Sequence, residues 1–96
     1  MSRTVYKYEI PMTGDYVEIK LPRGAEILHV AAQHETPYLW ALVDPKAPLV
    51  SRRLRFAGTG HTIAPDVGRH LGSFFVHDGA LVFHIFETTV FMEEMP

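Results

Sequence analysis

The fold is decided by the stretch Ser73–His84, whose sequence is SFFVHDGALVFH. Two apolar runs flank Asp78-Gly79, a dipeptide that favours the type I′ turn of a β-hairpin because both of its residues accept a positive φ. With these two residues as the loop, His77 lies opposite Ala80. Both faces of this hairpin are apolar, so the second face is predicted either to be covered by another layer of the domain or to form a subunit interface.

The same register makes specific predictions for the polar residues of the hairpin. Ser73 lies opposite His84 on one face, and His70 lies opposite Glu87 on the other. Gly72 has no side chain and leaves room for a large neighbour. A Ser–His pair is half of a nucleophile–base arrangement, but a flat strand has no elbow that would expose the hydroxyl.

Further runs of alternating or continuous apolar character surround this hairpin, separated by Gly, Pro and Asp. No window has the 3.6-residue period of a helix. We expect strands over residues 3–10, 16–21, 25–33, 38–43, 50–57, 69–77 and 80–90. Strands at this spacing predict an all-β fold, a single small antiparallel sandwich or barrel of about seven strands. Residues 1–96 are predicted to form a single β domain, with residues 91–96 as a frayed acidic tail.

The composition excludes several classes of protein. The chain has 96 residues, no cysteine and a net charge of −2, with 47% hydrophobic residues. Disulfides, Cys-based zinc sites and thiol catalysis are therefore excluded, and the charge argues against general nucleic-acid binding. No apolar run is long enough to cross a bilayer, and the first ten residues do not resemble a secretory signal. We expect a cytoplasmic protein that does not contact a membrane and has no cofactor.

The predicted core consists of the apolar residues assigned to the inward faces of the strands: Val17, Ile19, Leu21, Ile27, Val30, Trp40, Leu42, Phe74, Phe83 and Ile85. Trp40 is the residue of this set with the clearest alternative role. A buried Trp usually anchors a core, but Trp also forms the aromatic floor of ligand sites and the hot spots of interfaces.

Two neighbouring segments are candidates for ligand binding. Arg53 and Arg55 share a face of one strand, so their guanidinium groups could hold a phosphate or carboxylate. The next segment, Gly58-Thr59-Gly60-His61, exposes backbone N–H groups that suit the same oxygens. The plain alternatives are a solvated edge strand protected by charge and an ordinary turn. We expect any small ligand to be a nucleotide-like anion, with Trp40 available to stack on a base.

Six histidines in this chain suggest a second class of function. Three imidazoles can bind zinc with an open coordination position, but no HxH or HExxH spacing occurs. His61 together with His70 or His84 would be the centre of a small metal- or histidine-dependent hydrolase. Single histidines are more often surface or satisfied core residues, and no convergent acids accompany these.

Four segments carry a resemblance to a known group of proteins. They are VYKYEIP (5–11), LWALVDP (39–45), GTGH (58–61) and LVFHIFE (81–87). In this combination the chain resembles a family of uncharacterised small β-rich proteins of bacteria and their phages or prophages. The resemblance implies a bacterial or phage origin and no assigned activity.

The preferred hypothesis is a non-enzymatic, homo-oligomeric binding protein for an anionic small molecule or a host protein. The hydrolase is the alternative.

Overall fold

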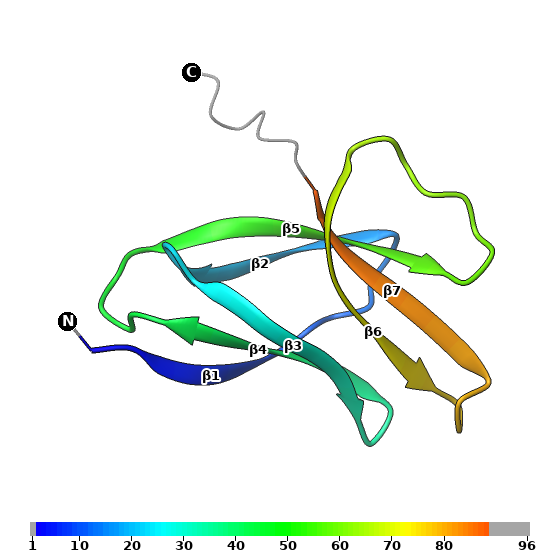
Figure 1. The fold of residues 1–96 in the computed structure, drawn as a ribbon, viewed down its shortest axis with the longest axis horizontal. Coiled ribbons are helices and arrows are strands. Elements are labelled where there is room, and N and C mark those ends of the chain that lie inside the picture. The colour runs from blue at the N-terminus through cyan, green and yellow to red at the C-terminus, as the bar shows by residue number, and fades with distance from the viewer. Residues whose placement is uncertain (1, 89–96) are drawn as a thin grey trace.

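The computed structural model describes residues 2–88, and these residues form seven strands and no helix (Figure 1). The strands are β1 (Thr4–Glu9), β2 (Tyr16–Pro22), β3 (Glu26–Gln33), β4 (Thr36–Val43), β5 (Leu49–Gly58), β6 (Val67–Val76) and β7 (Leu81–Thr88). The prediction of a small antiparallel all-β fold with about seven strands is confirmed. The predicted acidic tail, residues 91–96, lies outside the described residues. Within residues 2–88 there is no helix of the length and apolar character needed to cross a bilayer.

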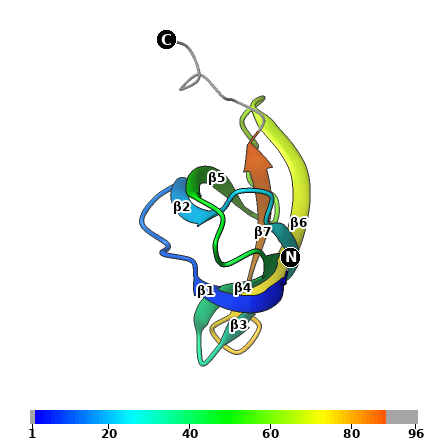
Figure 2. The same cartoon turned by 90° about the vertical axis from the view of Figure 1, so that its left-hand side faces the viewer.

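The strands form two sheets, which makes the fold a sandwich. Sheet A has the order β1-β4-β3, and sheet B has the order β2-β5-β7-β6. The edge strands β3 and β6 lie against each other, so the two sheets meet on that side of the molecule. Figure 2 shows that the sheets separate toward the opposite side, where β1 lies below and β2 above.

The hairpin β6–β7 has the predicted register near its turn. Val76 pairs with Leu81, and the same register continues to Gly72 opposite Ile85. The turn is wider than expected, because positive φ begins at His77 and continues through Asp78 and Gly79. The Ala80 N–H still donates to the His77 carbonyl at 2.9 Å. The register prediction is confirmed, and the loop has four residues in place of two.

Beyond Gly72 the predicted register is wrong. Two β-bulges in β6 shift the pairing, so that His70 lies opposite Phe86 and not opposite Glu87. An extra residue in one strand reverses the face on which the following side chains lie. His70 therefore lies on the outer face of sheet B, next to the Phe86 ring at 5.1 Å between centroids.

The core lies between the two sheets and takes buried side chains from strands of both. Six of the predicted core residues are buried, among them Leu21, Phe74 and Ile85. Val17, Trp40, Leu42 and Phe83 are only half-buried. In β4 the predicted face is wrong: the inward residues are Leu39, Ala41 and Val43. Both faces of this strand are apolar, so alternation did not distinguish them, and Trp40 takes the outer face, where its N–H can reach water.

Residues 59–66 connect β5 to β6 and cross the outer face of sheet B. Both strands run antiparallel to β7, which lies between them, so they are parallel to each other and the connection must pass over β7. The segment touches the outer face at both ends: Thr59 bonds to His84, and the Asp66 carbonyl accepts a hydrogen bond from Thr88. The second face of the apolar hairpin is thus partly covered by the domain itself.

Replacing Gly72 by Ala should destabilise the fold by about 1–3 kcal/mol, as overpacking of a tight interior does. A Cβ at this position would lie 3.1 Å from the Val30 Cβ, in the strand that faces it from sheet A. Urea unfolding measures the effect. Gly14→Ala is the control, because nothing lies within 4 Å of its added Cβ. The penalty should shrink in a Val30→Ala background, and an equal penalty in both backgrounds would contradict the steric explanation.

Candidate functional site

The two arginines of the predicted anion site lie side by side on the outer face of sheet B. Their guanidinium carbons lie 4.6 Å (Arg53) and 5.2 Å (Arg55) from the centre of the Tyr16 ring. Each also bonds to a carboxylate, Arg53 to Glu18 at 3.0 Å and Arg55 to Asp66 at 2.9 Å. The expectation of a solvated edge strand is wrong, because β5 lies between β2 and β7. The two side chains form ion pairs on an aromatic ring and do not form a free clamp.

Arg55 is the more enclosed of the two arginines. Its side chain and that of Asp66 are about four-fifths buried beneath the 59–66 segment, and the Thr88 hydroxyl lies 3.2 Å from the same carboxylate oxygen. The hydrogen bond from Arg55 lowers the pKa of Asp66 despite the desolvation that opposes it. One donor remains unused: Arg55 Nε is buried and has no hydrogen-bond acceptor in the described part of the chain.

Gly58 and His61 form a tight turn at the end of β5. The His61 N–H donates to the Gly58 carbonyl at 2.9 Å, and the imidazole folds back over the glycine. A Cβ at Gly58 would lie 2.9 Å from two atoms of that ring. The glycine therefore allows a close approach of the ring, as its place in the GTGH segment predicts.

Two cavities lie on either side of this imidazole. The first has a volume of about 170 Å³ and is lined by Arg55 and Asp15 together with residues 56–57 and 61–64. The second, of about 240 Å³, is lined by Gly58 and Thr59 and by the apolar residues 80–83 at the start of β7. His61 lines both cavities. The structure thus places a polar cavity and an apolar one beside the predicted loop.

Trp40 lies in the other sheet, apart from these cavities. It is on the outer face of sheet A, where its ring lies 5.5 Å from His29 and 6.3 Å from Tyr38 between centroids. Neither cavity is lined by Trp40. The structure brings Arg55 together with His61, and it leaves both Arg53 and Trp40 outside the two cavities.

The histidines of the hydrolase hypothesis form a chain of polar contacts over β6 and β7. Ser73 Oγ lies 2.8 Å from His84 Nδ1, as the hairpin register predicts, and Thr59 Oγ1 lies 2.8 Å from Nε2 of the same ring. His70 Nε2 lies 3.4 Å from the Ser73 hydroxyl. A general base in a triad uses its second nitrogen to bond to a carboxylate. Here both nitrogens of His84 contact hydroxyl groups, so neither nitrogen bonds to a carboxylate that would orient the ring.

The arrangement of the side chains also concerns the hypothesis of a metal-dependent hydrolase. Across residues 2–88, no three His, Asp or Glu side chains are grouped closely enough to hold a metal ion. His61 takes no part in the hydrogen-bond chain of His70 and His84, so the predicted pairing of these residues is not observed.

Sequence reasoning missed several residues of the site. Asp15, Tyr16, Asp66 and Thr88 come from three separate segments that the crossover brings onto one face. No spacing in the sequence indicates this, because residues 59–66 have no regular pattern of their own. The one available signal was the length of that connection, since long ordered loops are often functional.

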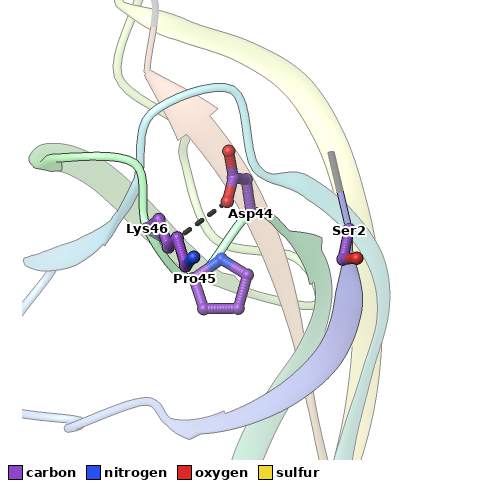
Figure 3. Close-up of a pocket in the computed structure, with 4 residues that line it drawn as sticks. All are labelled: Ser2, Asp44, Pro45 and Lys46. Atoms are coloured by element: carbon purple, nitrogen blue, oxygen red, sulfur yellow. Dashed lines mark hydrogen bonds between the residues drawn. The ribbon is translucent and has the colours of Figure 1, made fainter.

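A further pocket lies at the β4–β5 turn, beside the start of β1 (Figure 3). It has a volume of about 620 Å³ and is lined by Ser2, Asp44, Pro45 and Lys46. The Asp44 carboxylate accepts the Lys46 backbone N–H at 3.0 Å, which closes the turn. The Asp44 carboxylate is thus used to hold the turn. The pocket shares no lining residue with the two cavities at His61.

Comparison with known families gives a match over nearly the whole chain. A family model described as a domain of unknown function (DUF7352) matches residues 1–95. The chain belongs to the DUF7352 family. No curated protein and no solved structure matches the chain. Membership in this family accords with the resemblance to uncharacterised proteins and assigns no activity; it does not test the expected bacterial or phage origin.

The low pKa of Asp66 predicts how stability depends on pH. Its ordinary value is 3.8 and the folded protein lowers it, so the stabilisation is complete above that pH and is lost as the pH falls through the folded-state value. Asp66→Asn should remove this acid-dependent loss and flatten the low-pH limb of the unfolding free energy. Denaturation between about pH 2 and about pH 6 measures it. Asp78→Asn, in the exposed turn, is the control, and an unchanged limb in Asp66→Asn would contradict the prediction.

Proposed function

We propose that the protein is a non-enzymatic, homo-oligomeric binding protein for a small molecule that carries one anionic group and an apolar or aromatic body. The observation that supports this function is the pair of cavities that share His61. Ligand sites combine a mostly apolar lining with a few placed polar groups. A single pocket of either size is small for a nucleotide, but the two volumes together fall at the lower end of the usual range, about 300–1,000 Å³.

The polar cavity suits the anionic end of such a ligand. Arg55 lines it, and its guanidinium group could donate hydrogen bonds to an oxygen of a phosphate or carboxylate. His61 and Thr62 line the same cavity and add donors. The Asp15 carboxylate is also present, so the cavity favours one anionic group with hydroxyls beside it over a polyanion.

The apolar cavity suits the body of the ligand. Leu81, Val82 and Phe83 line it, and the Thr59 N–H is already bonded to the Val82 carbonyl at 3.2 Å. The loop is thus held against β7 by backbone bonding, which keeps the apolar wall in place without a ligand. The two cavities are small and concave, which favours a small molecule over a host protein as the occupant.

A non-enzymatic role accords with the polar contacts on this face. Arg53 and Arg55 are paired with carboxylates, and both nitrogens of His84 contact hydroxyl groups, so the contacts seen among residues 2–88 on this face form no nucleophile–base–acid series. Exposed apolar side chains support the homo-oligomeric part of the proposal. Phe75 is 62% exposed and Leu81 45% exposed at the tip of the β6–β7 hairpin, and Val5 and Tyr6 are about half-exposed on β1.

Isothermal titration calorimetry with a nucleoside monophosphate, a sugar phosphate and inorganic phosphate tests the proposal. At least one organic phosphate should bind more tightly than inorganic phosphate, because only it reaches the apolar cavity. Arg55→Gln should weaken that binding by about tenfold or more, the usual scale for a lost charge-assisted contact. Arg53→Gln is the matched control, since Arg53 has the same aromatic and carboxylate contacts but lines neither cavity.

A second variant separates binding from folding. Gly58→Ala adds no charge and should displace the His61 ring, because the new Cβ lies 2.9 Å from it. His61 is exposed and can move, so the fold should remain while binding weakens. Failure of all three compounds to bind the wild-type protein would overturn the proposal. Equal binding by Arg55→Gln and wild type would place the ligand elsewhere.

A further inference from the structure

Strand β1 is exposed to an unusual degree for part of a sandwich. It is an edge strand of sheet A, and only Tyr8 of its six residues is even half-buried. Val5 on the outer face is 48% exposed, and Tyr6 on the inner face is 46% exposed. An edge strand normally still buries its inner face, as β2 does with Ile19 and Leu21. Strand β1 therefore has both an unpaired edge and an uncovered inner face.

The hydrogen bonding of β1 shows which backbone groups point away from the sheet. The Ile10 N–H donates to the Pro37 carbonyl at 2.9 Å, in the register that continues through β1 and β4. In an antiparallel pair such bonds occur at every second residue. Thr4, Tyr6 and Tyr8 thus bond to β4. Their odd-numbered neighbours direct N–H and C=O groups to the free edge.

Lysine at a free edge usually blocks pairing with another strand. Lys7 does not act in this way here, because its side chain folds back over the outer face of sheet A. Its Nζ donates to Gln33 Oε1 at 3.0 Å and lies 4.5 Å from the centre of the Tyr38 ring. The edge of β1 remains open to a second strand.

We propose that β1 pairs with β1 of a second copy of this chain in an antiparallel, two-fold arrangement that places Arg3 opposite the partner's Glu9. Tyr6 then lies opposite the partner's Tyr6 on the two-fold axis, and Val5 lies opposite the partner's Lys7. This proposal deepens the homo-oligomeric part of the proposed function and does not depend on the ligand. No residue of β1 lines either cavity at His61.

The backbone and the charges select this register together. The outward groups belong to odd-numbered residues, so only registers that pair odd with odd can form bonds. Moving the partner's strand by two residues in one direction places Lys7 opposite the partner's Lys7, and these two positive charges repel each other. Shifting by four pairs Lys7 with the partner's Glu9 but brings Pro11, which has no N–H, into the ladder. The proposed register forms two Arg–Glu pairs and up to about eight backbone bonds.

The inner face gains apolar contact in this arrangement. Tyr6 and Tyr8 already lie together at 6.4 Å between ring centroids. Burial, with a smaller effect of the neighbouring Tyr6 phenol, raises the pKa of Tyr8, so the Tyr8 phenol stays neutral at ordinary pH. Directly opposite residues in a non-hydrogen-bonded pair have Cα atoms about 4.5 Å apart, a distance at which aromatic side chains interact. The partner's tyrosines thus extend the existing cluster.

Sedimentation velocity over a range of protein concentrations, at low salt, tests the arrangement with a charge exchange. Arg3→Glu and Glu9→Arg should each weaken association by about tenfold or more, because each places two like charges opposite each other at both ends. The double variant Arg3→Glu/Glu9→Arg should restore it. Arg23→Glu is the matched control, since it makes the same change in charge at the exposed β2–β3 turn.

Amide hydrogen exchange gives a second, residue-level readout. In the wild-type dimer the amides of Val5, Lys7 and Glu9 should be protected, and in Arg3→Glu they should exchange rapidly. The amides of Tyr6 and Tyr8 should stay protected in both, because β4 holds them. This pattern distinguishes loss of pairing from unfolding of β1.

The outcomes separate the proposals. A monomer at every concentration would overturn both this pairing and the homo-oligomeric part of the proposed function, while calorimetry tests ligand binding independently. A dimer that Arg3→Glu leaves intact would overturn the β1 pairing alone. If exchanging Lys7 and Glu9 restored association and exchanging Arg3 and Glu9 did not, the proposed register would be wrong.

Discussion

The close approach of β3 and β6 at Gly72 sets the shape of the molecule. A side chain at Gly72 would need the space that Val30 occupies, 3.1 Å from its Cβ. The sheets meet here and separate toward β1 and β2 (Figure 2), and fully buried side chains such as Leu21, Leu39 and Leu54 fill the space between them. Strand β1 lies on the side where the sheets separate, and Tyr6 on its inner face is 46% exposed.

The bulges in β6 let the polar residues of the hairpin find partners. By turning His70 to the outer face, they leave Glu87 on the inner face without the imidazole expected opposite it. Glu87 binds Arg52 through two hydrogen bonds, at 2.6 and 2.9 Å, and Arg52 also donates to the Ala25 carbonyl at 2.7 Å. This bridge joins sheet B to the residue that precedes β3. An ion pair with such geometry offsets much of the cost of its burial and fixes how the sheets sit on each other.

The local patterns in the sequence predicted the strands well and the long-range arrangement less well. Alternation and turn residues located all seven strands, and Asp78-Gly79 set the register up to Gly72. An isolated glycine within a strand also signals a bulge, and here it accompanies one. The inward face of β4 could not be predicted, because the adjacent residues Leu39 and Trp40 lie on opposite faces and are both apolar. The grouping of Arg55 with Asp66 depends on the crossover, which no local pattern describes.

The crossover and the β1 edge place the two proposed activities on different sheets. Residues 59–66 must pass over β7, and the space they leave beside His61 forms the two cavities on sheet B. Pairing through β1 would instead join two copies of sheet A into one six-stranded sheet, with Trp40 and Tyr38 of both copies on its outer face. Because β5 and β7 take no part in that contact, the cavities would stay open in the dimer. Ligand binding and association should then show little coupling, since coupling requires that one event change the affinity of the other.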